Sequence, residues 1–94
     1  MIIVSGRIYV RSGSRADFLA VSAQSMVQAR STPGCRDFVV AADPIEPDRV
    51  NVYEEWESEE SLLAFRESGP DEDLISVIED AIVLRHLVLS SGPA

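Results

Sequence analysis

The chain has 94 residues, a formal net charge of −8 at pH 7 and 46% hydrophobic residues, which together predict one small acidic domain over residues 1–94. This much negative charge repels phosphate backbones and anionic lipids, so it argues against nucleic acid or a membrane as a partner. The single cysteine, Cys35, excludes an intrachain disulfide framework and a cysteine metal cluster. The sequence has neither a signal-peptide pattern nor an apolar run of about 20 residues, so we expect a cytoplasmic protein.

The first third of the chain predicts a strand followed by a helix. Residues 2–10 are rich in β-branched residues and alternate as in a strand. A helix is expected over residues 14–30, because Ser14 and Asp17 have the spacing of a capping box and a narrow apolar stripe follows them. Pro33 cannot continue a helix, so the helix must end before it.

Two further strands and a second helix are expected next. The strands span residues 35–42 and 49–57, and a turn with two prolines separates them. Ser58 suits the N-cap of a helix whose first turn is acidic, where the helix dipole favours negative charge. This helix should end near Gly69.

The last quarter of the chain predicts a short helix over residues 71–81 and a closing strand over residues 82–90. The order is then β-α-β-β-α-β, the ferredoxin-like α+β plan of a four-stranded antiparallel sheet with helices on one face. Helices cover only one face of such a sheet, yet the first and last predicted strands carry apolar residues on both faces. We therefore expect a homodimer in which a second copy covers the open face.

One stretch carries a family pattern. Residues 32–65, "TPGCRDFVVAADPIEPDRVNVYEEWESEESLLAF", resemble the antibiotic biosynthesis monooxygenase (ABM) domain, which has a Pro-Gly-Cys-like turn, an Asp-Pro turn and a Tyr-Glu-x-Trp-Glu-Ser strand that enters a helix. The resemblance implies a dimeric α+β barrel with a pocket between sheet and helices. Some members of this family oxidise quinols or polyphenols with O₂ and no cofactor, some degrade haem, and others have no settled activity.

The chain departs from the family pattern at the polar positions of the pocket. Val52, Leu62 and Phe65 stand where branches of the family have an Asn, a Tyr and a His, respectively. The haem-degrading branch has an axial His after the second helix, where this chain has none, and its first-strand Asn is replaced near Gly6. We therefore expect no haem, and no Gly-rich phosphate loop or metal-ligand spacing points to another cofactor or to a metal.

The third predicted strand places Val52, Glu54 and Trp56 on one face, because strand side chains alternate. Trp56 is either a core anchor alone or both a core anchor and one wall of a pocket. An inward Glu54 either pairs with a cation or handles a substrate proton, since an unpaired buried carboxylate is costly. The candidate cations are Arg7, Arg85 and His86.

The single histidine, His86, is expected to face a mostly apolar layer together with Leu84 and Val88. It is either a core residue or the general base of a reaction, because imidazole titrates near neutral pH. Cys35 has no basic neighbour that would lower its pKa, so we do not expect it to act as a nucleophile.

Two functions remain open from the sequence. The first is an ABM-like cofactor-independent monooxygenase that acts on a small electron-rich aromatic, a quinol or polyphenol, in a cavity between sheet and helices. The second is a non-catalytic dimeric domain that binds a small molecule or a protein partner. In the first, His86 or Glu54 handles the proton, and the residues that shape the binding slot are Trp56, Phe65, Tyr9, Val52 and Leu62.

Overall fold

The computed structural model describes residues 1–67 and 72–94 and contains one four-stranded antiparallel sheet. The strands, in the spatial order β2-β3-β1-β4, are β1 (Ile2–Val10), β2 (Cys35–Ala42), β3 (Arg49–Trp56) and β4 (Ile78–Leu87). The helices are α1 (Arg15–Arg30), α2 (Glu59–Arg66) and α3 (Glu72–Ser76). The ferredoxin-like order with a split second helix is therefore confirmed.

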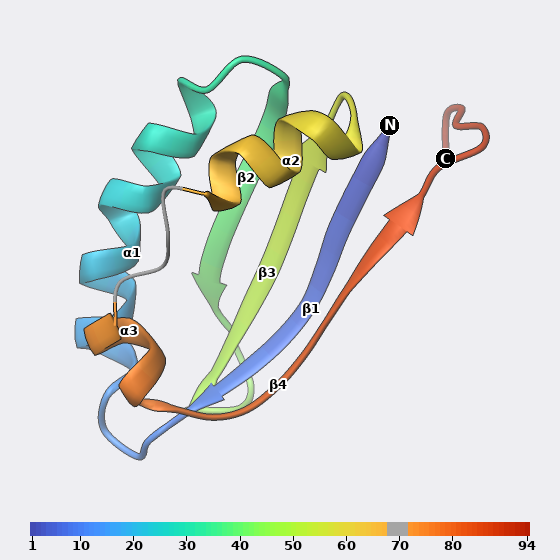
Figure 1. Ribbon diagram of the computed structural model, residues 1–94. Coiled ribbons are helices and arrows are strands. Elements are labelled where there is room, and N and C mark those ends of the chain that lie inside the picture. The colour runs from blue at the N-terminus through green and yellow to red at the C-terminus, as the bar shows by residue number, and fades with distance from the viewer. Residues whose placement is uncertain (68–71) are drawn as a thin grey trace.

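The helices lie on one side of the sheet and leave the other side open (Figure 1). α1 packs along β2, and α2 crosses over β3. β4 forms the sheet edge opposite β2 and so lies farthest from α1. Several large apolar residues of β4 are exposed: Ile82 and Leu84 point to the open face, and Leu87 lies at the end of this edge strand.

The antiparallel register decides which side chains face the helices. β1 pairs with β3 so that Ile2 lies opposite Trp56 and Val4 lies opposite Glu54. Paired residues point to the same face, so these four side chains all face the helices. The burial of β3 alternates accordingly, with every second residue buried. The face that the sequence predicted for Glu54 and Trp56 is therefore the covered one.

The core lies between sheet and helices in two clusters. The larger cluster contains Ile2, Val4, Ala29, Phe38, Trp56 and Leu62, and the smaller one contains Val10, Phe18 and Val50. Trp56 and Val50 are fully buried. Val40 packs against both clusters, which places the middle of the sheet between them.

The capping prediction holds for one helix and fails for the other. Ser58 caps α2, because its hydroxyl accepts a hydrogen bond from the Ser61 N–H at 3.2 Å. Ser14 lies at the N-cap of α1, but its side chain makes no cap hydrogen bond there. Its backbone is already helical, whereas a capping residue is usually extended. The predicted capping box of Ser14 and Asp17 is therefore wrong.

The predicted boundary between the last helix and the last strand is also wrong. The helix ends at Ser76 and the strand begins at Ile78, four residues earlier than residue 82. Ile78 pairs with Val10, because β1 would otherwise present an unpaired edge at this point. Pairing in the sheet thus overrides the helical spacing of apolar residues in this stretch. The predicted helix end near Gly69 lies outside the described residues.

Candidate functional site

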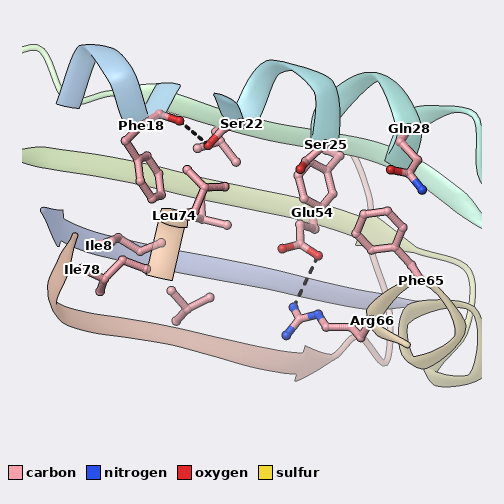
Figure 2. A pocket seen from close by; sticks show the side chains of 14 residues that line it. Ile8, Phe18, Ser22, Ser25, Gln28, Glu54, Phe65, Arg66, Leu74 and Ile78 are labelled. Atoms are coloured by element: carbon pink, nitrogen blue, oxygen red, sulfur yellow. Dashed lines mark hydrogen bonds and ion pairs between the residues drawn. The ribbon is translucent and has the colours of Figure 1, made fainter. Parts of the chain in front are cut away.

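A cavity of about 410 Å³ lies between the sheet and the helices. Its volume is in the range of small-molecule pockets, and its walls are mainly apolar, as such pockets usually are. Figure 2 shows the side chains around it. The apolar lining is Ile8, Phe18, Phe38, Val40, Val52, Phe65, Leu74, Ile78 and Val83, and the polar lining is Ser22, Ser25, Gln28, Glu54 and Arg66.

Glu54 supplies a buried carboxylate to this apolar cavity. The residue is only 5% exposed. Its Oε1 accepts a hydrogen bond from the Trp56 indole at 3.0 Å and lies 3.5 Å from Nη2 of Arg66. Among the described residues, no donor lies within hydrogen-bond distance of the second oxygen, Oε2. Every fully buried side-chain nitrogen or oxygen of these residues has a hydrogen-bond partner, so Oε2, which has none, is accessible. A ligand in the cavity can therefore donate a hydrogen bond to Glu54 (Figure 2).

Arg66 is the cation that pairs with Glu54, which corrects the three candidates from the sequence. Arg7 and His86 cannot reach Glu54, because strand alternation turns their side chains to the open face of the sheet. In the strand register, Arg7 lies opposite Asn51 and His86 lies opposite Ile3. Arg85 faces the helices but forms an ion pair with Glu59 at 2.6 Å. Arg66 reaches Glu54 because α2 folds back over β3, a relation that sequence spacing does not reveal.

Trp56 lies behind the cavity wall and is not part of the lining. Its ring centroid is 5.3 Å from that of Phe65, and the Phe38 centroid is 5.6 Å from that of Phe65. Phe65 and Phe38 line the cavity, and Trp56 supports both Phe65 and the Glu54 carboxylate. Of the two alternatives for Trp56, the structure therefore favours the core anchor.

α1 contributes a polar wall that the sequence analysis missed. Ser22, Ser25 and Gln28 follow one another at intervals of three and so share one face of the helix. The Ser22 hydroxyl donates to the Phe18 carbonyl at 2.7 Å and is thereby satisfied. The side chains of Ser25 and Gln28 make no hydrogen bond within the described residues, so they remain free for a ligand. The spacing of these three polar residues was the signal that could have identified them.

The remaining predicted residues fall in three places. Val52 and Phe65 line the cavity, whereas Leu62 is buried beside it and lines a second, smaller cavity. Tyr9 and His86 lie on the open face, so their predicted place at the slot is wrong for a single chain. The Tyr9 hydroxyl donates to the Glu46 carboxylate at 3.1 Å. The side chain of His86 is exposed opposite Ile3, since alternation along β4 turns it away from the helices.

The chemistry of the other ionisable and nucleophilic groups is limited. Burial, together with the negative charges of Glu54 and Asp37, raises the pKa of the Cys35 thiol above its ordinary value, so little reactive thiolate forms near neutral pH. Within residues 1–67 and 72–94, no three His, Cys, Asp or Glu side chains are placed to hold a metal ion. The same residues form no helix long and apolar enough to cross a membrane.

The fold and the cavity define a ferredoxin-like α+β domain with a pocket between its sheet and its helices. The family model "Antibiotic biosynthesis monooxygenase" (ABM) matches residues 1–72. The chain therefore belongs to the antibiotic biosynthesis monooxygenase family, as the resemblance in the sequence implied. No curated protein sequence matches it.

Several solved structures share the fold over almost the whole chain. A structure from Chloroflexus aurantiacus J-10-fl that carries the same family name is 28% identical, has a TM-score of 0.76, and covers 98% of this chain and 96% of its own. Another from Deinococcus radiodurans has a TM-score of 0.87 at 15% identity and covers 100% and 98%. A third from Nitrosomonas europaea has a TM-score of 0.83 at 15% identity and covers 96% and 100%. The last two similarities concern the fold alone.

Proposed function

We propose that this protein is a cofactor-independent monooxygenase that binds a small electron-rich aromatic, a quinol or polyphenol, in the 410 Å³ cavity. The observation that carries this proposal is the environment of the two Glu54 carboxylate oxygens. Its Oε1 is held by Trp56 and Arg66, and its Oε2 is accessible in a mainly apolar cavity whose lining includes three phenylalanines. This is the arrangement that a phenolic hydroxyl on a flat aromatic ring needs.

In the proposed reaction the protein supplies one proton acceptor, and the substrate supplies the electrons. Oε2 of Glu54 accepts the proton of the phenolic or enolic hydroxyl, and the substrate becomes an anion. This electron-rich anion transfers an electron to O₂ directly, so the substrate supplies the reducing equivalents. For a substrate with a ring methylene, one atom of O₂ becomes a ring carbonyl oxygen. The other atom leaves as water with the two methylene hydrogens.

We also propose that the functional unit is a homodimer formed through the open face of the sheet. Ile82 and Leu84 of β4 are 44% and 57% exposed on this face, and Ile3 of β1 lies on the same face, opposite His86. A second copy would remove these side chains from water, which is favourable for a small domain with a limited core. His86 shares this face, so we expect it at the interface and away from the cavity.

Oxygen consumption with a panel of anthrones and naphthohydroquinones tests the proposed activity. The protein-free rate is subtracted, because such compounds oxidise spontaneously. We expect saturable uptake that Glu54→Gln lowers by about 10²- to 10⁴-fold, the usual contribution of a general base. We expect His86→Ala, the matched control, to retain the rate.

Two results would overturn the assignment. Loss of activity in a His86→Ala variant that still sediments as a dimer, with Glu54→Gln unaffected, would make the histidine the base. Saturable binding of the aromatic without any protein-dependent oxygen uptake would instead support the second function, a non-catalytic small-molecule-binding domain of the same fold.

A further inference from the structure

A second cavity of about 250 Å³ adjoins the first between α2 and β4. The two cavities share Arg66 and Val83 as lining residues, so Arg66 stands at their junction. Arg85 also lines the second cavity, and the other lining residues are apolar. The second cavity thus combines two guanidinium groups with an apolar surround.

These two arginines retain unused hydrogen-bond donors. Arg66 contacts Glu54 through Nη2 at 3.5 Å, and Arg85 contacts Glu59 through Nη1 at 2.6 Å. Among the described residues, neither guanidinium has another hydrogen-bond or ion-pair partner. A guanidinium carries five N–H donors, so most donors of both side chains are available to a ligand.

The two arginines of the second cavity lie together in a chain that is acidic overall. The sequence has 16 acidic and 8 basic residues, so a free anion is repelled by the molecule as a whole. Two of the eight basic side chains nevertheless line one small cavity that shares lining residues with the aromatic-lined one. Each guanidinium is about half exposed and already pairs with one carboxylate, so its attraction for a further anion depends on its unused N–H donors.

We propose that the second cavity is a subsite for an acidic group on the ligand, a carboxylate or sulfonate. The ligand is then an anionic aromatic, with its rings in the first cavity and its acidic group between Arg66 and Arg85. The planar guanidinium fork matches two oxygens of such a group. The inference deepens the proposed function by adding a charge requirement to its ligand, but it concerns binding and requires no turnover.

A pair of fluorescent probes tests the subsite on the full chain. 8-Anilinonaphthalene-1-sulfonate and N-phenyl-1-naphthylamine share their ring system, and only the first carries an acidic group. We expect Arg85→Gln to weaken sulfonate binding by about tenfold, the loss of one charged hydrogen-bonded contact. Binding of the neutral amine should stay unchanged. Arg85→Gln is the main test because Arg85 does not contact Glu54.

Two further variants complete the experiment. Arg66→Gln should weaken the sulfonate in the same way, and Arg36→Gln, which removes an exposed charge outside both cavities, should affect neither probe. Unchanged affinity for the neutral amine shows that each variant retains the first cavity. Equal affinity of both probes for the unmodified chain, or equal losses for both probes in Arg85→Gln, would overturn the inference.

The result separates this inference from the proposed activity. Probe discrimination that depends on Arg85, without oxygen uptake on any quinol, would support the subsite and contradict the monooxygenase. Oxygen uptake that prefers neutral quinols and is insensitive to Arg85→Gln would support the monooxygenase and contradict the subsite.

Discussion

The indole N–H of Trp56 donates a hydrogen bond to Oε1 of Glu54 at 3.0 Å, and the two residues are neighbours on one face of β3. Residues two apart in a strand point the same way, so the strand itself brings this donor and acceptor together. Trp56 is fully buried and Glu54 nearly so. The residue that anchors the core therefore also fixes the carboxylate of the candidate site.

This pairing predicts an energetic coupling between the two side chains. Trp56→Phe should lower the free energy of unfolding by about 2–4 kcal/mol, because it leaves a gap in the core and removes the indole donor. In a double-mutant cycle with Glu54→Met, the coupling energy should be about 1–2 kcal/mol. Urea unfolding followed by circular dichroism measures all four variants. Additive losses would contradict the coupling.

A second prediction concerns Gly34 in the turn between α1 and β2. Its φ of +88° is strained for other residues, and a Cβ at this position would fall on the Ser61 side chain of α2. Gly34→Ala should therefore cost about 2–4 kcal/mol of unfolding free energy, from the backbone strain and the overlap together.

Gly13 provides the matched control for this substitution. Its φ is +82°, but a Cβ there would have no neighbour within 4 Å. Gly13→Ala should cost only the backbone term of about 1–2 kcal/mol. Equal losses of unfolding free energy in the two alanine variants would show that the close approach of Ser61 to Gly34 does not affect stability.

The third prediction is a pH dependence that comes from Asp43. Hydrogen bonds from the backbone N–H of Glu46, the Asn51 amide and the backbone N–H of Ile45 lower the pKa of Asp43 from 3.8 to about 2. Because the folded state holds the ionised form, its stabilisation is present above pH 3.8 and is lost as the pH falls toward 2. Asp43→Asn should lower the melting temperature at neutral pH and flatten its decline over this acid range. An unchanged slope of melting temperature against pH would contradict the assignment.

The fourth prediction is the dimer. Sedimentation at low micromolar concentration should give twice the chain mass of 10.3 kDa, and the melting temperature should rise with protein concentration. Leu84→Lys, which places a charge on the open face, should give a monomer. Val27→Lys is the control, since Val27 is 69% exposed on α1 and should leave the dimer intact. A monomer with a concentration-independent melting temperature would refute the proposed interface.

Local periodicity explains which parts of the fold and site could be predicted. The alternation along β3 placed Val52, Glu54 and Trp56 on one face, because the two-residue period of a strand is independent of the rest of the chain. The pairing of Glu54 with Arg66 could not be predicted in this way, since it depends on the angle at which α2 returns across β3. The first residue of β4 could not be predicted from local periodicity either, because it depends on the pairing of Ile78 with Val10 at the edge of β1.

The position of β1 in the sheet has a consequence for the order in which the chain can fold. β1 is an inner strand, and β4, the last strand of the sheet in chain order, covers one of its two edges along nearly its whole length. β1 leaves the ribosome before β4 and must therefore wait for residues 78–87 before this edge is paired. Such a non-local closing step slows folding and exposes an apolar strand edge during synthesis. Pairing of β4 with β1 thus completes the sheet and also removes the exposed edge through which the nascent chain could aggregate.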